Sequence, residues 1–349
     1  MTALQPAPRR ILYVASMDPY STTVYRCDAL RRLQQQVEVF DIREQIPGNY
    51  YLRALQSRYP SGPFIFSINR ALLEAAKRFQ PDVVWMDKPI LFTPKTLETL
   101  KRNGTRVVFY VQDSPFGGRQ DGIWKQFLAS YRLADLHCLV RQADVVRYRE
   151  RHLPYIQTMF SFAPEMHFPA PPGWTDAERV RLLSYIGHPY ENRPAFLTRL
   201  ATEWELPLSI NGNLWQKVLG TSALSHCTLG GHLPGPHYRE AIWRSRINLG
   251  FVTTSNEDDI GHKSVEIAAC GAFLLALRTP GHEALLEENR EAVFFSSVEE
   301  CADKARFYLD RPDLREAIGA HARERAVRSG YDNDTQLARI LNHLDGKQV

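Results

Sequence analysis

The chain has 349 residues, more than one ordinary hydrophobic core holds, so we expect two domains of roughly 150 to 200 residues. Hydrophobic residues make up 44% of the chain and charged residues 23%, proportions that are typical of soluble globular proteins. The formal net charge of +4 is small. It argues against a nucleic-acid-binding protein, which concentrates its basic residues on one face.

Five cysteines are scattered along the chain, and none belongs to a Cys-x-x-Cys pair. An odd number of cysteines without a pairing motif favours reduced thiols over a disulfide framework. The first ten residues contain no apolar signal core, and no apolar run approaches the roughly 18 residues that a membrane-spanning helix needs. We therefore expect a cytoplasmic protein without a transmembrane segment, for which peripheral contact with a membrane stays open.

The chain opens with the strand–loop–helix–strand pattern of a doubly wound α/β domain. An apolar run over 11–15 predicts a buried parallel strand, Ser21 or Thr22 can cap the following helix, and 37–42 predicts a second strand. The first turn lacks Gly-x-Gly-x-x-Gly, so we do not expect a dinucleotide to be held there in the usual way. The same patterns predict helices over 71–79, 94–102 and 143–151, and strands over 81–88, 106–111, 136–140 and 156–160.

Two carboxylates follow predicted strands of this first half. Asp18 comes after the first strand, and Asp113 lies in the polar, glycine-rich loop 112–118. Open α/β sheets place their ligands at the carboxyl ends of strands, so both residues are candidates for a site. The aromatic and basic stretch 49–70 could form an acceptor-binding or membrane-touching surface, but packing of a loop and helix on the sheet is favoured.

The segment 167–174 is the richest in proline, and we interpret it as a semi-rigid linker between domains. The α/β pattern then starts again, with strands predicted over 181–186, 208–210, 247–252 and 272–277, helices over 194–204, 237–244 and 301–309, and two arginine-rich helices to the end. We expect a first domain over 1–168, a second over 175–330, and a C-terminal helix in 331–349 that packs back toward the first domain.

A short helix begins near residue 262, with His262, Lys263 and Ser264 in its first turn, and Gly271 ends it before the next strand. Ser264 can cap the helix, and we place Glu266 in its first turn, where a carboxylate suits the positive end of the helix dipole. A helix N-terminus beside a histidine and a lysine is also a ready site for an anion.

If the two sheets face each other, the cleft between the carboxyl ends of their strands is the expected ligand site. The second domain offers four loops to one ligand there: 187–193, 211–213, 231–233 and 262–266. Their glycines permit close backbone approach, Arg193 and Lys263 supply positive charge, and Glu266 can accept hydrogen bonds from a diol. A diphosphate joined to a ribose needs that set of partners.

The run from Lys263 to Leu277 resembles the C-terminal domain of GT-B glycosyltransferases, and more narrowly the CgeB-like, spore-maturation-protein-like group with its (R/K)-x-x-E-I-x-A-x-G-x-F-L-L signature. The resemblance continues in the second half through 184–187, 192–193, 247–249, 280–281, 292–295, 308–309, Arg315 and 323–331. It is looser in the first half, at 81–85 and 113–115. It implies two Rossmann-like domains that face each other across a cleft and transfer a sugar from a nucleoside-diphosphate sugar.

Carried over position by position, the resemblance implies that Glu266 holds the ribose and that Lys263 and its helix N-terminus hold the diphosphate. Arg193 and Gly187 would assist, and the backbone of 231–233 would contact the base. The predicted donor site comprises Gly187, Arg193, Asn211, Gly231, His232, Leu233, His262, Lys263, Ser264 and Glu266.

An inverting transfer also needs a base on the acceptor hydroxyl, and we expect it from the first domain: Asp18 or Asp113, with Asp87 as third candidate. Asp258 and Glu266 have the eight-residue spacing of the paired acids in retaining relatives, but aspartate replaces glutamate, so either stereochemistry stays open. The spacing of His226, Cys227, His232 and His237 fits no usual zinc site. We expect no metal and no cofactor, with a UDP- or dTDP-sugar as co-substrate.

Two other functions fit the same sequence. A sugar-nucleotide epimerase would bind the same diphosphate without a separate acceptor, and a binding or regulatory protein would keep the donor pocket without catalysis. The acceptor of a transferase could be a glycan, a lipid, a protein or a small molecule.

Overall fold

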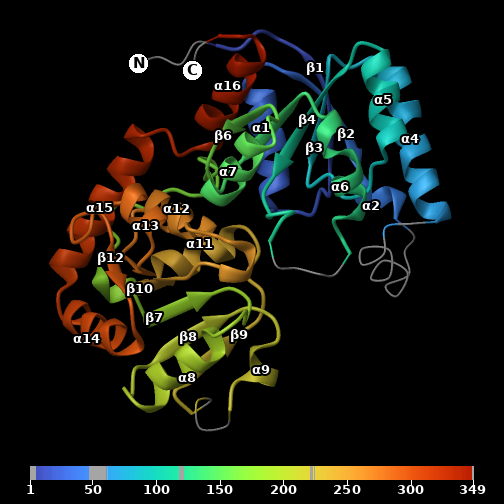
Figure 1. Ribbon diagram of the computed structural model, residues 1–349. Coiled ribbons are helices and arrows are strands. Elements are labelled where there is room, and N and C mark those ends of the chain that lie inside the picture. Colours follow the sequence, from blue (N-terminus) through green and yellow to red (C-terminus); the bar gives the residue numbers. More distant parts are fainter. Residues whose placement is uncertain are drawn as a thin grey trace. The chain divides into compact units, whose positions relative to one another are not determined.

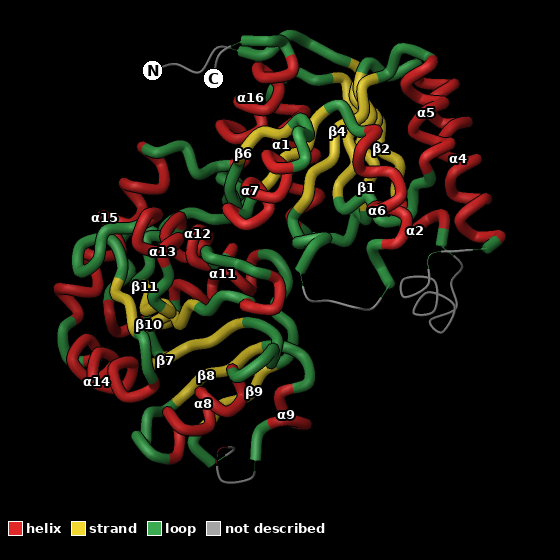
Figure 2. The backbone as a smooth tube through the Cα atoms, in the orientation of Figure 1, coloured by secondary structure: helices red, strands yellow, loops and turns green. Residues whose placement is uncertain are grey.

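The computed structural model describes residues 5–46, 60, 62–117, 122–220, 223 and 225–347. The chain forms two compact units (Figures 1 and 2). The first comprises Met1–Met159, Ser255–Glu257 and Asn333–Val349, and the second comprises Phe160–Thr254 and Asp258–Asp332. Each unit has its own cluster of buried hydrophobic side chains, as the length of the chain requires.

The first unit is built on a six-stranded parallel sheet of order β2-β1-β3-β4-β5-β6. Its strands are β1 (Arg10–Ala15), β2 (Gln36–Asp41), β3 (Val83–Asp87), β4 (Arg106–Val111), β5 (Leu136–Leu139) and β6 (Tyr155–Gln157). Its helices are α1 (Thr22–Arg32), α2 (Ile42–Gln45), α4 (Pro63–Phe79), α5 (Pro94–Arg102), α6 (Lys125–Ser130), α7 (Gln142–Glu150) and α16 (Asn333–Leu344). The strand order reverses between β1 and β3, which makes the carboxyl ends of these strands the favoured place for a ligand.

The second unit has a six-stranded parallel sheet of order β12-β11-β10-β7-β8-β9. Its strands are β7 (Arg181–Ile186), β8 (Leu208–Asn211), β9 (Cys227–Gly230), β10 (Ser245–Gly250), β11 (Leu274–Leu277) and β12 (Val293–Phe295). Its helices are α8 (Arg193–Thr202), α9 (Trp215–Val218), α11 (Pro236–Trp243), α12 (His262–Ala269), α13 (Pro280–Leu285), α14 (Val298–Leu309) and α15 (Pro312–Arg328). This is the Rossmann strand order, and its switch point lies between β7 and β10.

The predicted doubly wound α/β class is confirmed in both units. The predicted helix 94–102 and the predicted strands 106–111 and 181–186 agree with α5, β4 and β7 to the residue. The short elements α2, α6, α9, α13 and β9 were not predicted. Part of the aromatic and basic stretch 49–70 lies outside the described residues, and its last residues belong to α4.

The interpretation of 167–174 as a linker is wrong, because this segment packs within the second unit. His167 is buried, and the Trp243 Nε1–H donates to the Phe168 carbonyl at 2.8 Å. The rings of Phe168 and Trp174 lie 5.6 and 5.9 Å from that of Trp243. Aromatic contacts with Trp243 of α11 therefore hold this segment on the second unit.

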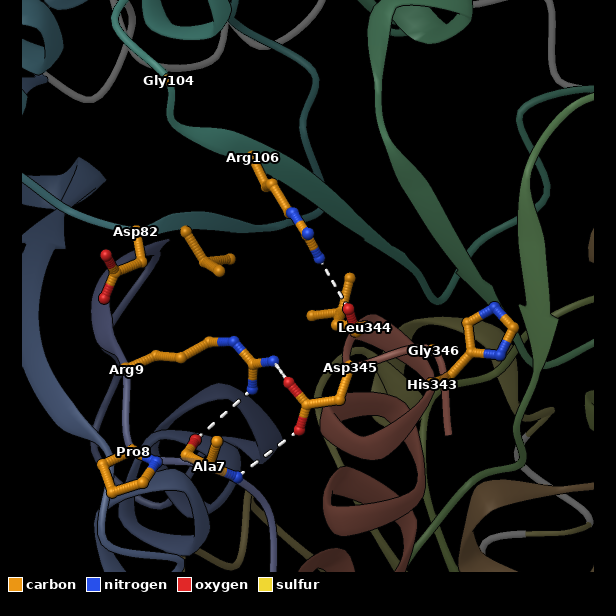
Figure 3. A pocket seen from close by; sticks show the side chains of 11 residues that line it. Ala7, Pro8, Arg9, Asp82, Gly104, Arg106, His343, Leu344, Asp345 and Gly346 are labelled. Carbon is orange, nitrogen blue, oxygen red and sulfur yellow. Dashed lines mark hydrogen bonds and ion pairs between the residues drawn. The ribbon is translucent and has the colours of Figure 1, made fainter. Parts of the chain in front are cut away.

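The C-terminal helix α16 packs on α1 and belongs to the first unit (Figure 1). Arg32 of α1 donates two hydrogen bonds of 2.8 Å to Asp334. Past the end of the helix, Asp345 forms an ion pair with Arg9, and Arg106 donates to the Leu344 carbonyl at 2.6 Å (Figure 3).

These contacts border an open cavity of about 780 Å³. Its lining includes Arg9, Asp82 and Arg106, which lie at the amino ends of β1, β3 and β4 (Figure 3). Ligands of this fold class bind at the carboxyl ends of the strands, so this cavity lies at the opposite edge of the sheet. Among the described residues, no helix combines the length and the apolar composition that crossing a membrane requires.

Candidate functional site

Glycines bring the loops after β7 and β8 into backbone contact next to the switch point of the second sheet. A Cβ on Gly187 would lie 2.6 Å from the Tyr185 hydroxyl, and a Cβ on Gly212 would lie 2.1 Å from the Gly187 carbonyl. Gly212 also has a φ of +143°, which side chains rarely allow. Trp215 Nε1–H fixes the same carbonyl with a hydrogen bond of 2.7 Å. A larger residue at Gly212 would have to move the Gly187 backbone, and a larger residue at Gly187 would have to displace the Tyr185 side chain.

The start of α12 is anchored by a buried histidine. The Nε2 atom of His282 accepts a hydrogen bond from the Gly261 N–H at 3.1 Å and lies 2.9 Å from the Ser264 hydroxyl. Its Nδ1–H therefore faces the Leu277 carbonyl, at 2.7 Å. Burial lowers the pKa of His282, which favours this neutral form. One uncharged side chain thus ties the first turn of α12 to the end of β11.

This anchor corrects the prediction for Ser264. The residue before α12 is Gly261, and Ser264 lies inside the helix, where its side chain makes no capping hydrogen bond. The hydroxyl is fully buried against His282. Its role is therefore to fix the helix start, and a ligand does not reach it.

Glu266 is held by three ring side chains. It is the fifth residue of α12, so its predicted place in the first turn is wrong. Its Oε2 accepts a hydrogen bond of 2.7 Å from Tyr238 of α11, and its Oε1 lies 3.6 Å from His262 Nε2 and 3.7 Å from His167 Nε2. Burial alone would raise the pKa of Glu266, but His262, His167, Lys263 and the Tyr238 hydrogen bond hold it below its usual value. The carboxylate is therefore ionised and oriented.

Positive charge gathers beside Glu266. Among the described residues, Lys263 Nζ has no hydrogen-bond or ion-pair partner. Burial lowers the pKa of Lys263, with Glu266 opposing and Arg193 adding to the effect. Burial and the charges of Lys263, His232 and Arg193 likewise lower the pKa of His188. These mutual repulsions show that four basic groups share one region, where an anion would relieve them.

Arg193, the first residue of α8, uses its guanidinium to hold the loop after β10. It donates to the Val252 carbonyl and the Thr253 hydroxyl, both at 2.8 Å, and to the Tyr185 hydroxyl at 3.2 Å. None of these acceptors carries a full negative charge. The buried cation thus stays uncompensated and adds to the field at Lys263.

Asn211, at the end of β8, supports the loop predicted to contact a base. Its Oδ1 accepts from Arg181 at 2.6 Å, and its Nδ2 donates to the Gly231 carbonyl at 3.3 Å. The side chain is buried, so it anchors this loop from within. Gly231 and His232 are exposed, Leu233 is half-buried, and a Cβ on Gly231 would contact nothing. The backbone of 231–233 is therefore open to a ligand.

The candidate bases of the first unit differ in their surroundings. Asp18, after β1, is exposed and lies 3.2 Å from Arg43. Asp113, after β4, lies 2.7 Å from Lys88 Nζ. Both are accessible carboxylates at the carboxyl edge of the sheet, and both form an ion pair.

Asp87, the third candidate, is unsuitable as a base because it is buried in a structural ion pair. It accepts from Arg26 at 2.8 Å and from the Tyr13 hydroxyl at 2.7 Å. Arg26 and Asp87 are 2% and 3% exposed, so an acceptor hydroxyl does not reach this carboxylate.

Sequence reasoning did not identify Tyr238, His167 and His188 as parts of the site. Tyr238 and His167 lie 28 and 99 residues from Glu266 in the chain, and only the packing of α11 and of the proline-rich segment joins them to it. The sole signal for His188 was its place beside Gly187 in a predicted ligand loop. Among the described residues, no three histidine, cysteine, aspartate or glutamate side chains gather as a metal ion would require.

The second half of the chain matches a known family. Residues 193–342 match the model of a family described as glycosyl transferase-like, a segment that includes α12 and its loops. None of the curated protein sequences compared with this chain matches it.

Solved structures of similar fold cover nearly the whole chain. Sucrose-phosphate synthase from Thermosynechococcus elongatus has a TM-score of 0.68 at 11% identity, over 97% of this chain and 100% of that one. Anabaena HepE in complex with UDP-glucose has a TM-score of 0.67 at 13% identity, over 97% and 100%. A glycosyltransferase from Rickettsia africae has a TM-score of 0.68 at 11% identity, over 97% and 99%. The chain therefore has the GT-B fold of two Rossmann-like units.

Proposed function

We propose that this protein is a glycosyltransferase that moves a sugar from a nucleoside-diphosphate sugar to an acceptor. The observation that carries the proposal is that α12 carries both the ionised Glu266 carboxylate and Lys263, whose side chain has no hydrogen-bond or ion-pair partner among the described residues. A ribose diol needs an acceptor of hydrogen bonds, and a diphosphate needs uncompensated positive charge. The match of 193–342 to a glycosyl transferase-like family supports the same function.

In the proposed donor complex, Glu266 accepts hydrogen bonds from the ribose. Lys263 and the N-terminus of α12 bind the diphosphate, and the Arg193 charge supports them. The open backbone of 231–233 contacts the base. Uridine is favoured over thymidine, because related folds have been solved with UDP-glucose and with UDP. The signature at 263–275 further supports membership of the CgeB-like group.

Transfer breaks the bond between the anomeric carbon and the diphosphate oxygen, and negative charge grows on the leaving group. Lys263 and Arg193 stabilise that charge in place, which is the role that a divalent cation has in other enzymes. The acceptor hydroxyl loses a proton as its oxygen bonds to the anomeric carbon. Asp18 and Asp113 are the accessible carboxylates of the first unit that could accept this proton.

The test is incubation of the purified protein with a panel of UDP- and dTDP-sugars and candidate acceptors, with and without EDTA. Release of nucleoside diphosphate together with a glycosylated product supports the proposal, and its persistence in EDTA supports a metal-independent transfer. An altered sugar on an intact nucleotide would instead establish an epimerase. Binding without turnover across the acceptor panel would favour a donor-binding protein.

A further inference from the structure

Tyr238 forms the one direct hydrogen bond to the Glu266 carboxylate that the described residues provide. Its hydroxyl donates to Oε2 at 2.7 Å from α11, a different helix from the one that carries Glu266. Burial and the Glu266 charge raise the pKa of Tyr238 well above its usual value, so the hydroxyl keeps its proton. The bond therefore has a fixed direction, from tyrosine to carboxylate.

The other carboxylate oxygen of Glu266, Oε1, lies near two histidines but accepts no hydrogen bond from either. His262 Nε2 is directed at the Ser161 carbonyl, 3.0 Å away, and His167 Nδ1 accepts from the Ala163 N–H at 3.2 Å. His167 thus carries its proton on Nε2, which faces Oε1 at 3.7 Å, beyond hydrogen-bond range. Both imidazoles attract the carboxylate, while Oε1 keeps its lone pairs for a ligand.

The terminal torsion of a glutamate side chain is broad, so charge alone does not set the plane of its carboxylate. A short hydrogen bond to one oxygen does set that plane, and with it the direction of the lone pairs on the other. Tyr238 and Lys263 also line the same small cavity, so the residue that holds Glu266 lies close to the lysine predicted to bind the diphosphate.

We propose that Tyr238 is a positioning residue that fixes Glu266 on the ribose 2′-hydroxyl and so makes the site select ribonucleoside over deoxyribonucleoside diphosphates. The inference rests on the proposed donor site and deepens it. A buried carboxylate aimed at a hydroxyl rejects a ligand that lacks it, because the carboxylate then stays desolvated and unpaired. The donor is accordingly a UDP-sugar, and a dTDP-sugar is a poor one.

The test compares UDP with 2′-deoxy-UDP by calorimetric titration of the wild-type chain and Tyr238→Phe. The wild type is expected to prefer UDP by about tenfold or more, the scale of a hydrogen bond to a charged group. Tyr238→Phe is expected to lose most of this preference through weaker binding of UDP, with 2′-deoxy-UDP bound nearly as before. Tyr308→Phe removes a hydroxyl from another buried tyrosine of the same unit and should keep the wild-type ratio.

Three results would overturn the inference, and they are distinct. If Tyr238→Phe weakens both ligands in proportion, the tyrosine acts only on stability, which thermal unfolding of the variant would also show. If the wild type binds UDP and 2′-deoxy-UDP equally, Glu266 does not hold the 2′-hydroxyl, although the donor site survives. If the wild type binds neither nucleotide, the proposed function fails as well.

Discussion

The Ser264 hydroxyl lies 2.9 Å from Nε2 of His282, and this contact places the helix on which Lys263 and Glu266 stand. His282 follows α12 in the chain and is fully buried, so it affects the site by positioning the helix and does not contact a ligand. The first turn of α12 owes its position to this neutral imidazole and not to a capping side chain.

Replacement of His282 by alanine should therefore destabilise the second unit and weaken donor binding together. The change leaves the Gly261 N–H and the Ser264 hydroxyl without their partner in a buried place, at a cost of about 2–4 kcal/mol in the free energy of unfolding. Denaturant unfolding and UDP titration measure the two effects. Ser264→Ala keeps the Gly261 bond and should cost about 1 kcal/mol; equal costs for both variants would contradict the anchoring role.

Removal of either charge of the donor site should weaken binding without unfolding the protein. Lys263→Ala and Glu266→Ala are each expected to lose about 1–3 kcal/mol of UDP binding energy, the range of a charge-assisted hydrogen bond. Titration calorimetry gives the value. Arg290→Ala, an exposed arginine of the same unit, serves as the charge control. Wild-type affinity in both site variants would show that the donor binds elsewhere.

The carboxylates of the first unit should separate catalysis from stability. Asp113→Asn or Asp18→Asn is expected to lower kcat while the thermal midpoint changes little, because both side chains are accessible. Asp87→Asn should instead cost about 3–5 kcal/mol of stability, since it leaves the buried Arg26 charge uncompensated. Turnover assays and unfolding curves on the three variants give the comparison. Full turnover in both accessible variants would remove them as bases.

Local signals explain which elements were predictable from the sequence. Pro94 marks the start of α5, and the Asn103–Gly104 turn marks its end and precedes β4. The predicted bounds of this helix and this strand agree with the structure to the residue. The apolar runs of β1 and β4 are buried on both faces, as is typical of parallel strands, and β7 is buried in its middle. The Glu266 and Lys263 motif was visible because its residues lie within one helix.

What escaped prediction depends on contacts between distant residues. The burial of Asp87 follows from Arg26, 61 residues earlier, and the orientation of Glu266 follows from Tyr238, 28 residues earlier. The proline-rich segment was misinterpreted because its composition resembles that of a linker. Its aromatic residues in fact pack against Trp243. No local pattern encodes these partners, so the sequence predicted the type of site and the packing determined its geometry.

His137 should make the first unit sensitive to acid. It is fully buried on β5 among aromatic rings, and burial lowers its pKa from 6.5 to about 4. Between pH 6.5 and 4, His137 is protonated in the unfolded chain and neutral in the folded chain. The free energy of unfolding is therefore highest above pH 6.5 and falls as the pH drops toward 4. The loss amounts to about 3 kcal/mol. Unfolding curves of His137→Gln from pH 7 to 4 should lose this slope, whereas His321→Gln, at an exposed position, should keep it.

The C-terminal helix should stabilise the first unit specifically. Ile340 of α16 is fully buried, and its replacement by alanine is expected to cost about 2–5 kcal/mol. Because α16 packs on α1, amide hydrogen exchange should rise in residues 22–32 of Ile340→Ala and stay unchanged in residues 262–269. Ile318→Ala, which opens the core of the second unit, should give the reverse pattern. If both variants raise exchange equally in both helices, the two units unfold as one cooperative core, and the prediction of separate stabilities is wrong.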